Sequence, residues 1–277
     1  MQALIQLEVK KFLSRNETYF LLVVTVLLSV LGLYQPFEMH KEVYYHNIMP
    51  SAAQMSMIYT GFVGQCCIFY LTPLIASLSH ADSYYIEYKN RMLNQNVIRV
   101  SIGKYIFAKI VIVSIFAFIF TVLPFVLNQI YCLIAFPAPN IYFEASTSYY
   151  DNPLTYAIRA PFFYQIAVNH PLLNNFLHIA LLGVYGSLFG ILTVGLSLYI
   201  KSNRLTVLFM STAISLFSAF ILEGFRLNIL NLSFYFYANP LLQDKGMMQF
   251  VLVFVGFAVV CFGIIGYFLK FKKDKLL

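Results

Sequence analysis

The stretch that decides the fold is polar: residues 86–104 read IEYKNRMLNQNVIRVSIGK and carry four basic residues and one acidic residue. Long apolar runs flank this stretch, at 57–79 before it and at 105–135 after it. A helix needs about 20 mostly apolar residues to cross a hydrocarbon core of about 30 Å. The sequence therefore predicts that this stretch is the polar connection between two transmembrane helices.

The composition of the whole chain is that of a membrane protein. Of the 277 residues, 60 % are hydrophobic and only 10 % are charged, and the mean hydropathy is +0.76. A soluble domain carries about 25 % charged residues. The length leaves no room for a separate soluble domain beside the apolar runs. We therefore expect residues 1–277 to form a single polytopic transmembrane domain of the all-α class.

Six apolar runs are long enough to be transmembrane helices. They cover residues 19–37, 57–79, 105–135, 176–200, 205–224 and 247–269. If both termini are cytoplasmic, fourteen of the eighteen lysine and arginine residues fall on inner segments. The outer segments then hold only Lys41, Arg159, Arg226 and Lys245. Because basic residues gather on cytoplasmic segments, the sequence places both termini and residues 86–104 in the cytoplasm.

Two outer segments and one proline carry further expectations. Residues 225–246 are apolar but interrupted by Asn and Pro, so they predict a short re-entrant or interfacial hairpin rather than a seventh span. Residues 136–175 are rich in Tyr, Phe and Pro. They are expected to lie along the outer interface, where aromatic rings settle, or to form a substrate gate. Pro124 predicts a kink in the third span or an end that emerges from the bilayer.

The N-terminal segment has an amphipathic pattern. Ile5, Val9, Phe12 and Leu13 share one helical face, while the basic residues among them lie elsewhere. This pattern is typical of a helix in the cytoplasmic interface, with its basic side toward anionic headgroups. Residues 14–17, SRNE, have the form of a capping box. The chain is therefore expected to turn there and to begin the first span as a new helix.

The polar stretch and the residues before it predict a helix over 80–93. Tyr85 and Tyr88 fall on one face of this helix, and Glu87 lies elsewhere. Orientation alone explains the basic residues, but an aromatic face with a carboxylate at mid-helix favours docking on another protein. Beyond this helix, Lys109 is expected to extend back from the third span toward the headgroups.

Small residues mark the fourth span. Gly183, Gly186 and Gly190 lie on it, and residues 186–190 have the GxxxG pattern. Small residues let two helix backbones approach closely. The pattern predicts tight helix packing, either within the chain or between two chains.

The sequence lacks the motifs of common membrane enzymes and ATPases. It contains no GxxxxGK[ST], HExxH or GxSxG. Its five histidines are scattered and its four cysteines lie in apolar runs, so neither zinc nor a disulfide framework is predicted. The spans are almost free of ionisable residues, which argues against proton-driven or ion-driven transport. We expect no enzymatic activity, no bound metal or cofactor and no nucleic-acid partner.

Together these parts resemble the permease subunits of type-2 ABC exporters, whose ATPase is usually a separate chain. The resemblance rests on the amphipathic first helix, known as the elbow in that family, on six spans and on the helix between spans two and three. Glu87, Arg99 and Lys109 occupy places comparable to an acid, an arginine and a lysine of the family's second intracellular segment. Residues 88–91, YKNR, stand where the family often has a Gly-Thr pair.

The resemblance implies that the helix after the second span is a coupling helix, seated in a groove of an ATP-binding cassette ATPase. The residues that it assigns to this contact are Asp82, Tyr85, Glu87, Tyr88, Arg91 and Arg99. The ATPase would bind ATP and Mg, and a second permease chain, identical or a sibling, would complete a pathway in the bacterial plasma membrane. The expected cargo is an amphipathic molecule such as a hydrophobic peptide, an antibiotic or a lipid. The alternative is a polytopic sensor or scaffold, or a secondary transporter, without an ATPase.

Overall fold

The computed structural model describes residues 2–39, 51–59, 61–90, 102–137, 163–200, 203–225, 227, 230–236 and 247–271. Within these ranges the chain is helical and contains no β-strand. Five helices there are long and apolar enough to cross a membrane, and the number is six if a bent pair of helices forms one span. The architecture is compatible with a multi-pass membrane protein.

Five of the predicted spans are long single helices. These helices are α2 (Asn16–Met39), α7 (Ile102–Ala135), α11 (Pro171–Ser197), α12 (Arg204–Gly224) and α13 (Met247–Phe271). Each coincides with an apolar run of the sequence. The α7 helix continues through Pro124, which is buried.

The second predicted span is broken and begins later than its apolar run. Residues 51–59 form turns. The helical part consists of α3 (Phe62–Cys66), a π-helical turn η2 (Cys67–Leu71) and α4 (Thr72–Leu78). A short helix, α5 (Ser83–Lys89), follows at a bend of 40°. The predicted start at residue 57 is thus corrected to Phe62, because the turns before it are apolar in composition but not helical.

Amide side chains on α7 and α11 hold the turns of residues 51–59. Asn128 accepts a hydrogen bond from the Met57 N–H at 2.7 Å and donates to a carbonyl of α2 at 3.1 Å. Gln129 and Asn175 donate to carbonyls within the turns, at 3.1 and 2.9 Å. Non-helical backbone at membrane depth requires partners of this kind. These three side chains, all fully buried, are called the amide layer below.

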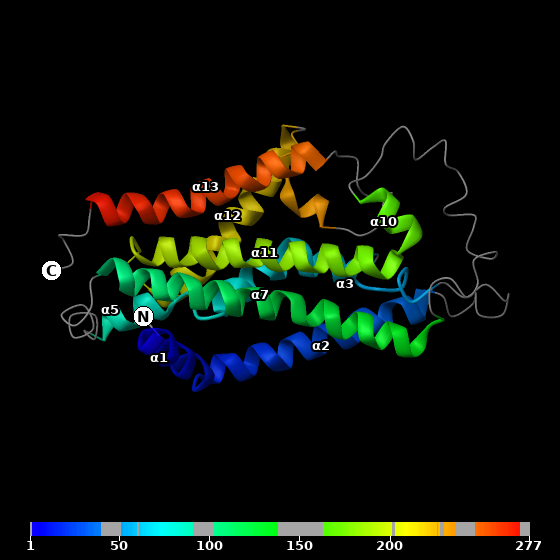
Figure 1. The fold of residues 1–277 in the computed structure, drawn as a ribbon, viewed down its shortest axis with the longest axis horizontal. Helices are drawn as coiled ribbons and strands as arrows, with labels where there is room; N and C mark the ends of the chain where they lie inside the picture. The colour runs from blue at the N-terminus through cyan, green and yellow to red at the C-terminus, as the bar shows by residue number, and fades with distance from the viewer. Residues whose placement is uncertain are drawn as a thin grey trace.

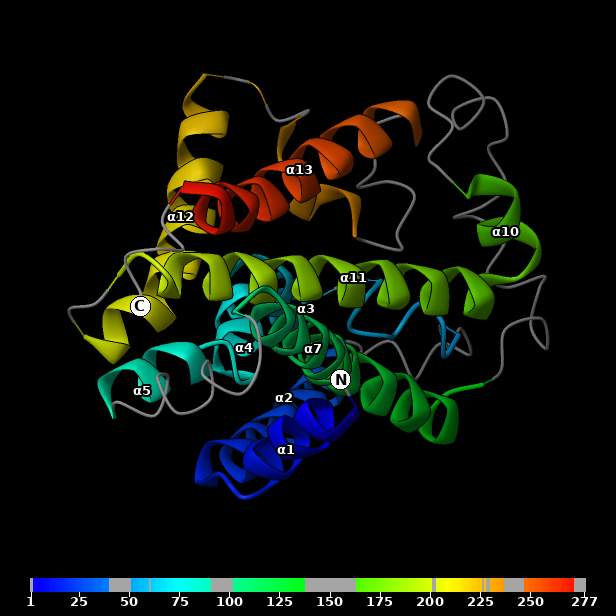
Figure 2. The same ribbon diagram turned by 60° about the vertical axis from the view of Figure 1, so that its left-hand side comes forward.

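The α7 and α11 helices form the centre of the bundle (Figures 1 and 2). They make the most extensive helix pair among the described residues, and glycines on α11 permit it. An added Cβ would lie 2.4 Å from the nearest α7 side chain at Gly183, 2.5 Å from Thr121 at Gly186, and 3.0 Å from α7 at Gly190. The three predicted packing glycines therefore face a helix of their own chain.

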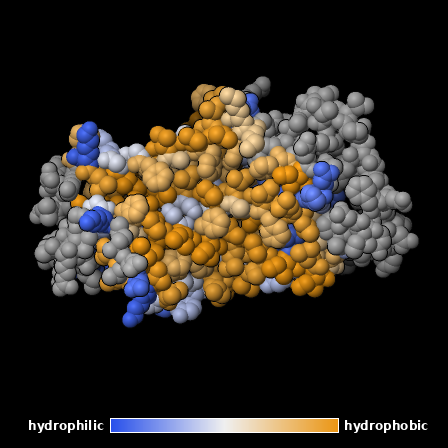
Figure 3. Space-filling model, viewed as in Figure 1, coloured by the Kyte–Doolittle hydropathy of each residue, from blue (hydrophilic) through white to orange (hydrophobic). Residues whose placement is uncertain are grey.

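The outer helices expose apolar surface. In the spanning window of α13 only 17 % of residues are buried, against 72 % in that of α11. Hydrophobic residues cover the middle of the face in Figure 3, and hydrophilic ones appear near its two ends. The N-terminal helix α1 (Gln2–Leu13), α5 and the C-terminal end of α13 all lie toward the same end of the molecule (Figure 1).

Candidate functional site

The α1 helix packs against α7. The predicted break after it is present, because α1 ends just before the predicted capping box and α2 begins within it. Of the predicted apolar face, Phe12 is buried, Ile5 and Val9 are half-buried, and Leu13 is exposed. Glu8 is buried beside Phe12. The face that α1 presents to the chain is therefore partly charged, and Leu13 does not belong to it.

Four charged side chains form a closed ring at this end of the molecule. Lys11 contacts Glu8 at 3.2 Å and Glu87 at 2.7 Å. Lys109 contacts the same two carboxylates, at 3.1 Å each. All but Lys11 are buried, and Lys109 is only 1 % exposed. The ring ties α1, α5 and α7 together.

Lys109 is fully hydrogen-bonded inside the bundle. Its ammonium group has three donors, which reach Glu8, Glu87 and the Ser83 hydroxyl, the last at 3.0 Å. Tyr105, one turn earlier on α7, donates its hydroxyl to Glu87. A buried charge is costly unless it is paired and hydrogen-bonded. The prediction that Lys109 extends to the headgroups is wrong, because α1 and α5 bring it two buried carboxylates.

A second group of ion pairs joins α5 to α2 and α12. Asp82 accepts hydrogen bonds from Arg15 at 2.9 Å and from Arg204 at 2.5 Å. Arg204, the first residue of α12, also contacts Glu17 of α2 at 2.6 Å. Both groups together are called the charged cluster below, and its members are Glu8, Lys11, Arg15, Glu17, Asp82, Glu87, Lys109 and Arg204. Four acids balance four bases, so the cluster has no net charge.

His80 forms the turn between α4 and α5. Its φ of 76° is left-handed, a conformation that residues other than glycine adopt rarely. Its Nε2 lies 3.0 Å from Glu8 Oε2, and its ring packs edge-on against Phe12. Burial lowers the pKa of His80, and the charges of Arg15 and Lys109 add to this against the opposing effect of Glu8. The ring is therefore neutral near neutral pH, and its Nε2–H donates to Glu8.

The ring also determines the protonation states of Glu8 and Lys11, its two members on α1. Burial by itself would raise the pKa of Glu8, but the hydrogen bond from His80 and the charges of Lys109 and Lys11 hold that pKa well below its ordinary value of 4.5. Burial would lower the pKa of Lys11, whereas its contacts with Glu87 and Glu8 raise the pKa above 10.5. Both groups remain charged at physiological pH, so the arrangement acts as an electrostatic connection between helices.

The α5 helix turns most of its predicted contact residues inward. Asp82, Tyr85 and Glu87 are each no more than 5 % exposed. Tyr88 is half-buried, and the exposed side chain at the end of α5 is Lys89. Asp82 and Glu87 therefore contact helices of this chain, and the surface that α5 offers to a partner is near its C-terminal end.

Other predicted features lie wholly or partly outside the described residues. Arg91 and Arg99 lie outside them, as do most of the outer segment 136–175 and the second half of the predicted hairpin. The outer segment includes one described helix, α10 (Tyr164–Asn169). The described part of the hairpin includes a short 3-10 helix, η4 (Leu232–Tyr235), which Asn231 caps by accepting a hydrogen bond from the Ser233 N–H at 3.1 Å.

Of the charged cluster, only Asp82 and Glu87 are among the residues that the sequence analysis assigns to a partner contact. Two signals in the sequence point to other members. Glu8 lies four residues before Phe12 and therefore on the same helical face. Lys109 interrupts an apolar run that needs no charge. A charge in such a place is expensive and commonly has a partner.

Within the described parts of the chain, no three His, Cys, Asp or Glu side chains are arranged to hold a metal ion. No protein-family model, curated protein or solved structure matches this chain. The charged cluster is the candidate functional site among the described residues.

Proposed function

We propose that this chain is the permease subunit of a type-2 ABC exporter, which moves an amphipathic substrate outward while a separate subunit hydrolyses ATP. In this proposal α1 is the elbow helix, α5 is the coupling helix, and α3, η2 and α4 together form one of six spans. Both termini face the cytoplasm of a bacterial cell. The ATPase subunit binds ATP and Mg, and a second permease chain, identical or a sibling, completes the pathway.

The observation that carries the proposal is the attachment of α5. This helix is only seven residues long, yet ion pairs of two buried carboxylates connect it and the turn before it to four other segments. Glu87 contacts Lys11 of α1 and Lys109 of α7. Asp82 contacts Arg15, between α1 and α2, and Arg204 of α12. A short helix that follows a span needs no such connections merely to link two spans.

These connections suit a helix that transmits force. The Glu87–Lys109 pair is buried on both sides, and breaking such a pair costs about 3–5 kcal/mol. A displacement of α5 would therefore carry α1, α7 and the start of α12 with it. ATP-driven closure of an ATPase against α5 would in this way reach the ends of several spans at once.

The spacing of the polar groups supports the proposed position in the membrane. Lys109 and Asn128 are both on α7, and nineteen residues of helix separate them by about 28 Å. The intervening residues 110–127 carry no charge. This distance is close to the thickness of a hydrocarbon core. This spacing supports a position of the charged cluster and the amide layer near the two boundaries of the bilayer, and the proposed orientation puts the cluster on the cytoplasmic side.

The test is whether an ATPase binds through α5. We expect a P-loop ATPase, identified by mass spectrometry, to co-purify with the C-terminally tagged chain after gentle extraction from its native membrane. Lys89→Glu reverses the exposed charge at the end of α5 and should release the ATPase. Lys10→Glu makes the same change at an exposed position of α1 and should retain it.

Glu87 is unsuitable for this test because it is buried in the ring, so its replacement would alter folding as well as docking. Recovery of the wild-type chain without an ATPase would contradict the proposal and favour a scaffold or a self-sufficient transporter. Equal recovery of the ATPase with both lysine variants would contradict the assignment of α5 as the contact.

A further inference from the structure

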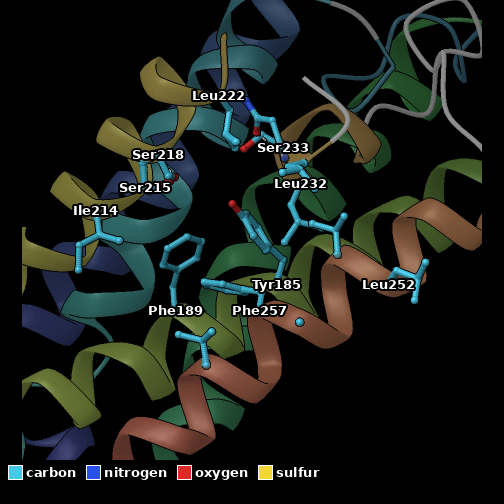
Figure 4. Close-up of a pocket in the computed structure, with 15 residues that line it drawn as sticks. Tyr185, Phe189, Ile214, Ser215, Ser218, Leu222, Leu232, Ser233, Leu252 and Phe257 are labelled. Carbon is cyan, nitrogen blue, oxygen red and sulfur yellow. Dashed lines mark hydrogen bonds between the residues drawn. The ribbon is translucent and has the colours of Figure 1, made fainter. Parts of the chain in front are cut away.

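A cavity of about 600 Å³ lies between α11, α12, α13 and η4 (Figure 4). Its size falls within the range of about 300–1,000 Å³ typical of small-molecule sites. It is remote from the charged cluster: no member of that cluster lines it. The cavity is therefore a second candidate site, separate from the one that carries the proposed function.

Most of the cavity wall is apolar, and no lining residue is charged. Aromatic rings of Phe189 and Phe257 form one part of the apolar wall, and aliphatic side chains, mainly from α12 and α13, form the rest of it. Some of these aliphatic residues are themselves on the molecular surface: Ile214 is 36 %, Leu252 64 % and Val260 56 % exposed. They belong to helices that are apolar enough to span a membrane. The cavity therefore opens on the apolar surface of the spans, where a ligand would enter from the lipid.

One part of the cavity is polar. The Tyr185 side chain lines the cavity together with Ser215 and Ser233, and Figure 4 shows it pointing from α11 toward these serines. Its ring packs against Phe189, with centroids 4.8 Å apart, and against Phe257, at 6.0 Å. The hydroxyl groups are donors and acceptors without charge. This polar group suits an uncharged hydrogen-bonding ligand and offers nothing to balance an ion.

The same polar group borders a second, smaller cavity. That cavity, of about 260 Å³, lies among α3, η2 and α12, and Ser215 and Ser233 line both cavities. Ser215 of α12 and Ser233 of η4 therefore lie between the two cavities.

We propose that the larger cavity binds one acyl or alkyl chain of an uncharged amphipathic molecule, whose amide, ester or hydroxyl head contacts Tyr185, Ser215 and Ser233. A resident membrane lipid and a transported amphipath share this chemistry. The binding does not depend on an ATPase, so it can be tested even if the proposed exporter function fails.

The probe is a monoacylglycerol that carries a photoreactive diazirine in its chain, added to the purified chain in phosphatidylcholine nanodiscs. We expect its cross-links to map to residues that line the cavity. The matching fatty acid, with the same chain and an ionised head, should label these residues at least about fivefold less, because a buried charge without a partner is costly. Labelling by both probes alike, or only on exposed residues elsewhere, would overturn the proposal.

Two glycines of α13 provide matched variants. Gly256 lines the cavity, Gly263 does not, and a Cβ added at either meets nothing within 4 Å. Gly256→Phe should fill the cavity and abolish the labelling, whereas Gly263→Phe should leave it unchanged. Both substitutions are made on the same helix at positions where an added Cβ has open space, so a difference between them reports on the cavity. Unchanged labelling of Gly256→Phe would overturn the proposal.

Tyr185→Phe tests the polar part without changing the shape of the cavity. Loss of one hydrogen bond should weaken labelling by the neutral probe about fivefold. Equal labelling of this variant and the wild type would overturn the assignment of the head group. Lipid extraction identifies the source: a neutral lipid that co-purifies with the wild type and not with Gly256→Phe indicates a resident lipid. If no neutral lipid co-purifies while the probe still labels the cavity, the result supports an amphipathic molecule that enters the cavity from outside the protein.

Discussion

Lys109 is the residue that closes the ring of buried charges. Each of its three N–H groups donates to a side chain of α1 or α5. Lys109→Met would leave Glu8 and Glu87 with only Lys11 between them. We expect it to lower the free energy of unfolding by about 3 kcal/mol, because a buried ion pair that loses one partner leaves an uncompensated charge.

Lys104→Met is the matched control, since Lys104 is exposed on the same helix. Thermal unfolding of both purified variants in detergent measures the difference. A midpoint for Lys109→Met equal to that of Lys104→Met would show that the ring does not stabilise the fold.

Acidic pH should lower the folding stability of the protein because Glu8 becomes protonated. Its pKa in the folded protein lies below the ordinary value of 4.5, so its stabilising effect is present above that value and is lost as the pH falls toward the folded pKa. Glu8→Gln should therefore be less stable near neutral pH and should lose less stability between about pH 5 and pH 3. Unfolding midpoints across this range test it, with the exposed Glu38→Gln as control. Parallel curves for Glu8→Gln and the wild type would refute this role.

The charged residues also mark the limit of prediction from sequence. The helix after the second span could be predicted from its polarity and its place between apolar runs. The burial of Glu87 could not, because one of its partners, Lys11, is 76 residues earlier in the chain. Glu8 and Lys109 are 101 residues apart. A local sequence pattern does not show contacts between residues so far apart. The pattern therefore suggested exposed charges where the folded chain has buried ones.

At the scale of helices, the glycines of α11 set how closely it approaches α7. A Cβ at Gly186 would lie 2.5 Å from Thr121, which is β-branched and bonded to a carbonyl of its own helix at 2.7 Å. We expect Gly186→Ala to cost about 1–3 kcal/mol through overpacking. Helix propensity alone would make the same change favourable by about 0.5–1 kcal/mol.

Gly266→Ala is the control, because a Cβ there meets nothing within 4 Å. It should stabilise the chain slightly, so the two substitutions should shift the unfolding midpoint in opposite directions. The same direction for both would mean that the close contact of α11 with α7 is not required.

The helices themselves differ in how well sequence predicts them. Long apolar runs form helices because a backbone in lipid must satisfy its own hydrogen bonds, and this fixes α2, α7, α11, α12 and α13. The turns of residues 51–59 end in residues 57–59, which belong to a predicted apolar run. They avoid the helix because the amide layer supplies partners for their backbone from α7 and α11. Apolar length alone therefore could not locate the start of α3.

For the whole molecule, the proposed orientation predicts which positions face outward. Cysteines introduced at Lys10 and Lys270 should react with a membrane-impermeant maleimide only after cells are permeabilised. Cysteines at Glu38 and Met247, at the opposite ends of α2 and α13, should react in intact cells. Three of the four native cysteines are buried, which keeps the background low. Labelling of Lys10 and Glu38 positions from the same side would contradict the topology.

The residues of the charged cluster are also synthesised in a definite order. Lys109 and Arg204 are its two cations on helices that are long and apolar enough to span a membrane, and each follows all of its acidic partners in the chain. N-terminal segments leave the ribosome first, so Glu8 and Glu87 have been made before Lys109 reaches the membrane. An unpaired charge in the bilayer is expensive. During biosynthesis the acidic partners of each cation are therefore already present when that cation reaches the membrane.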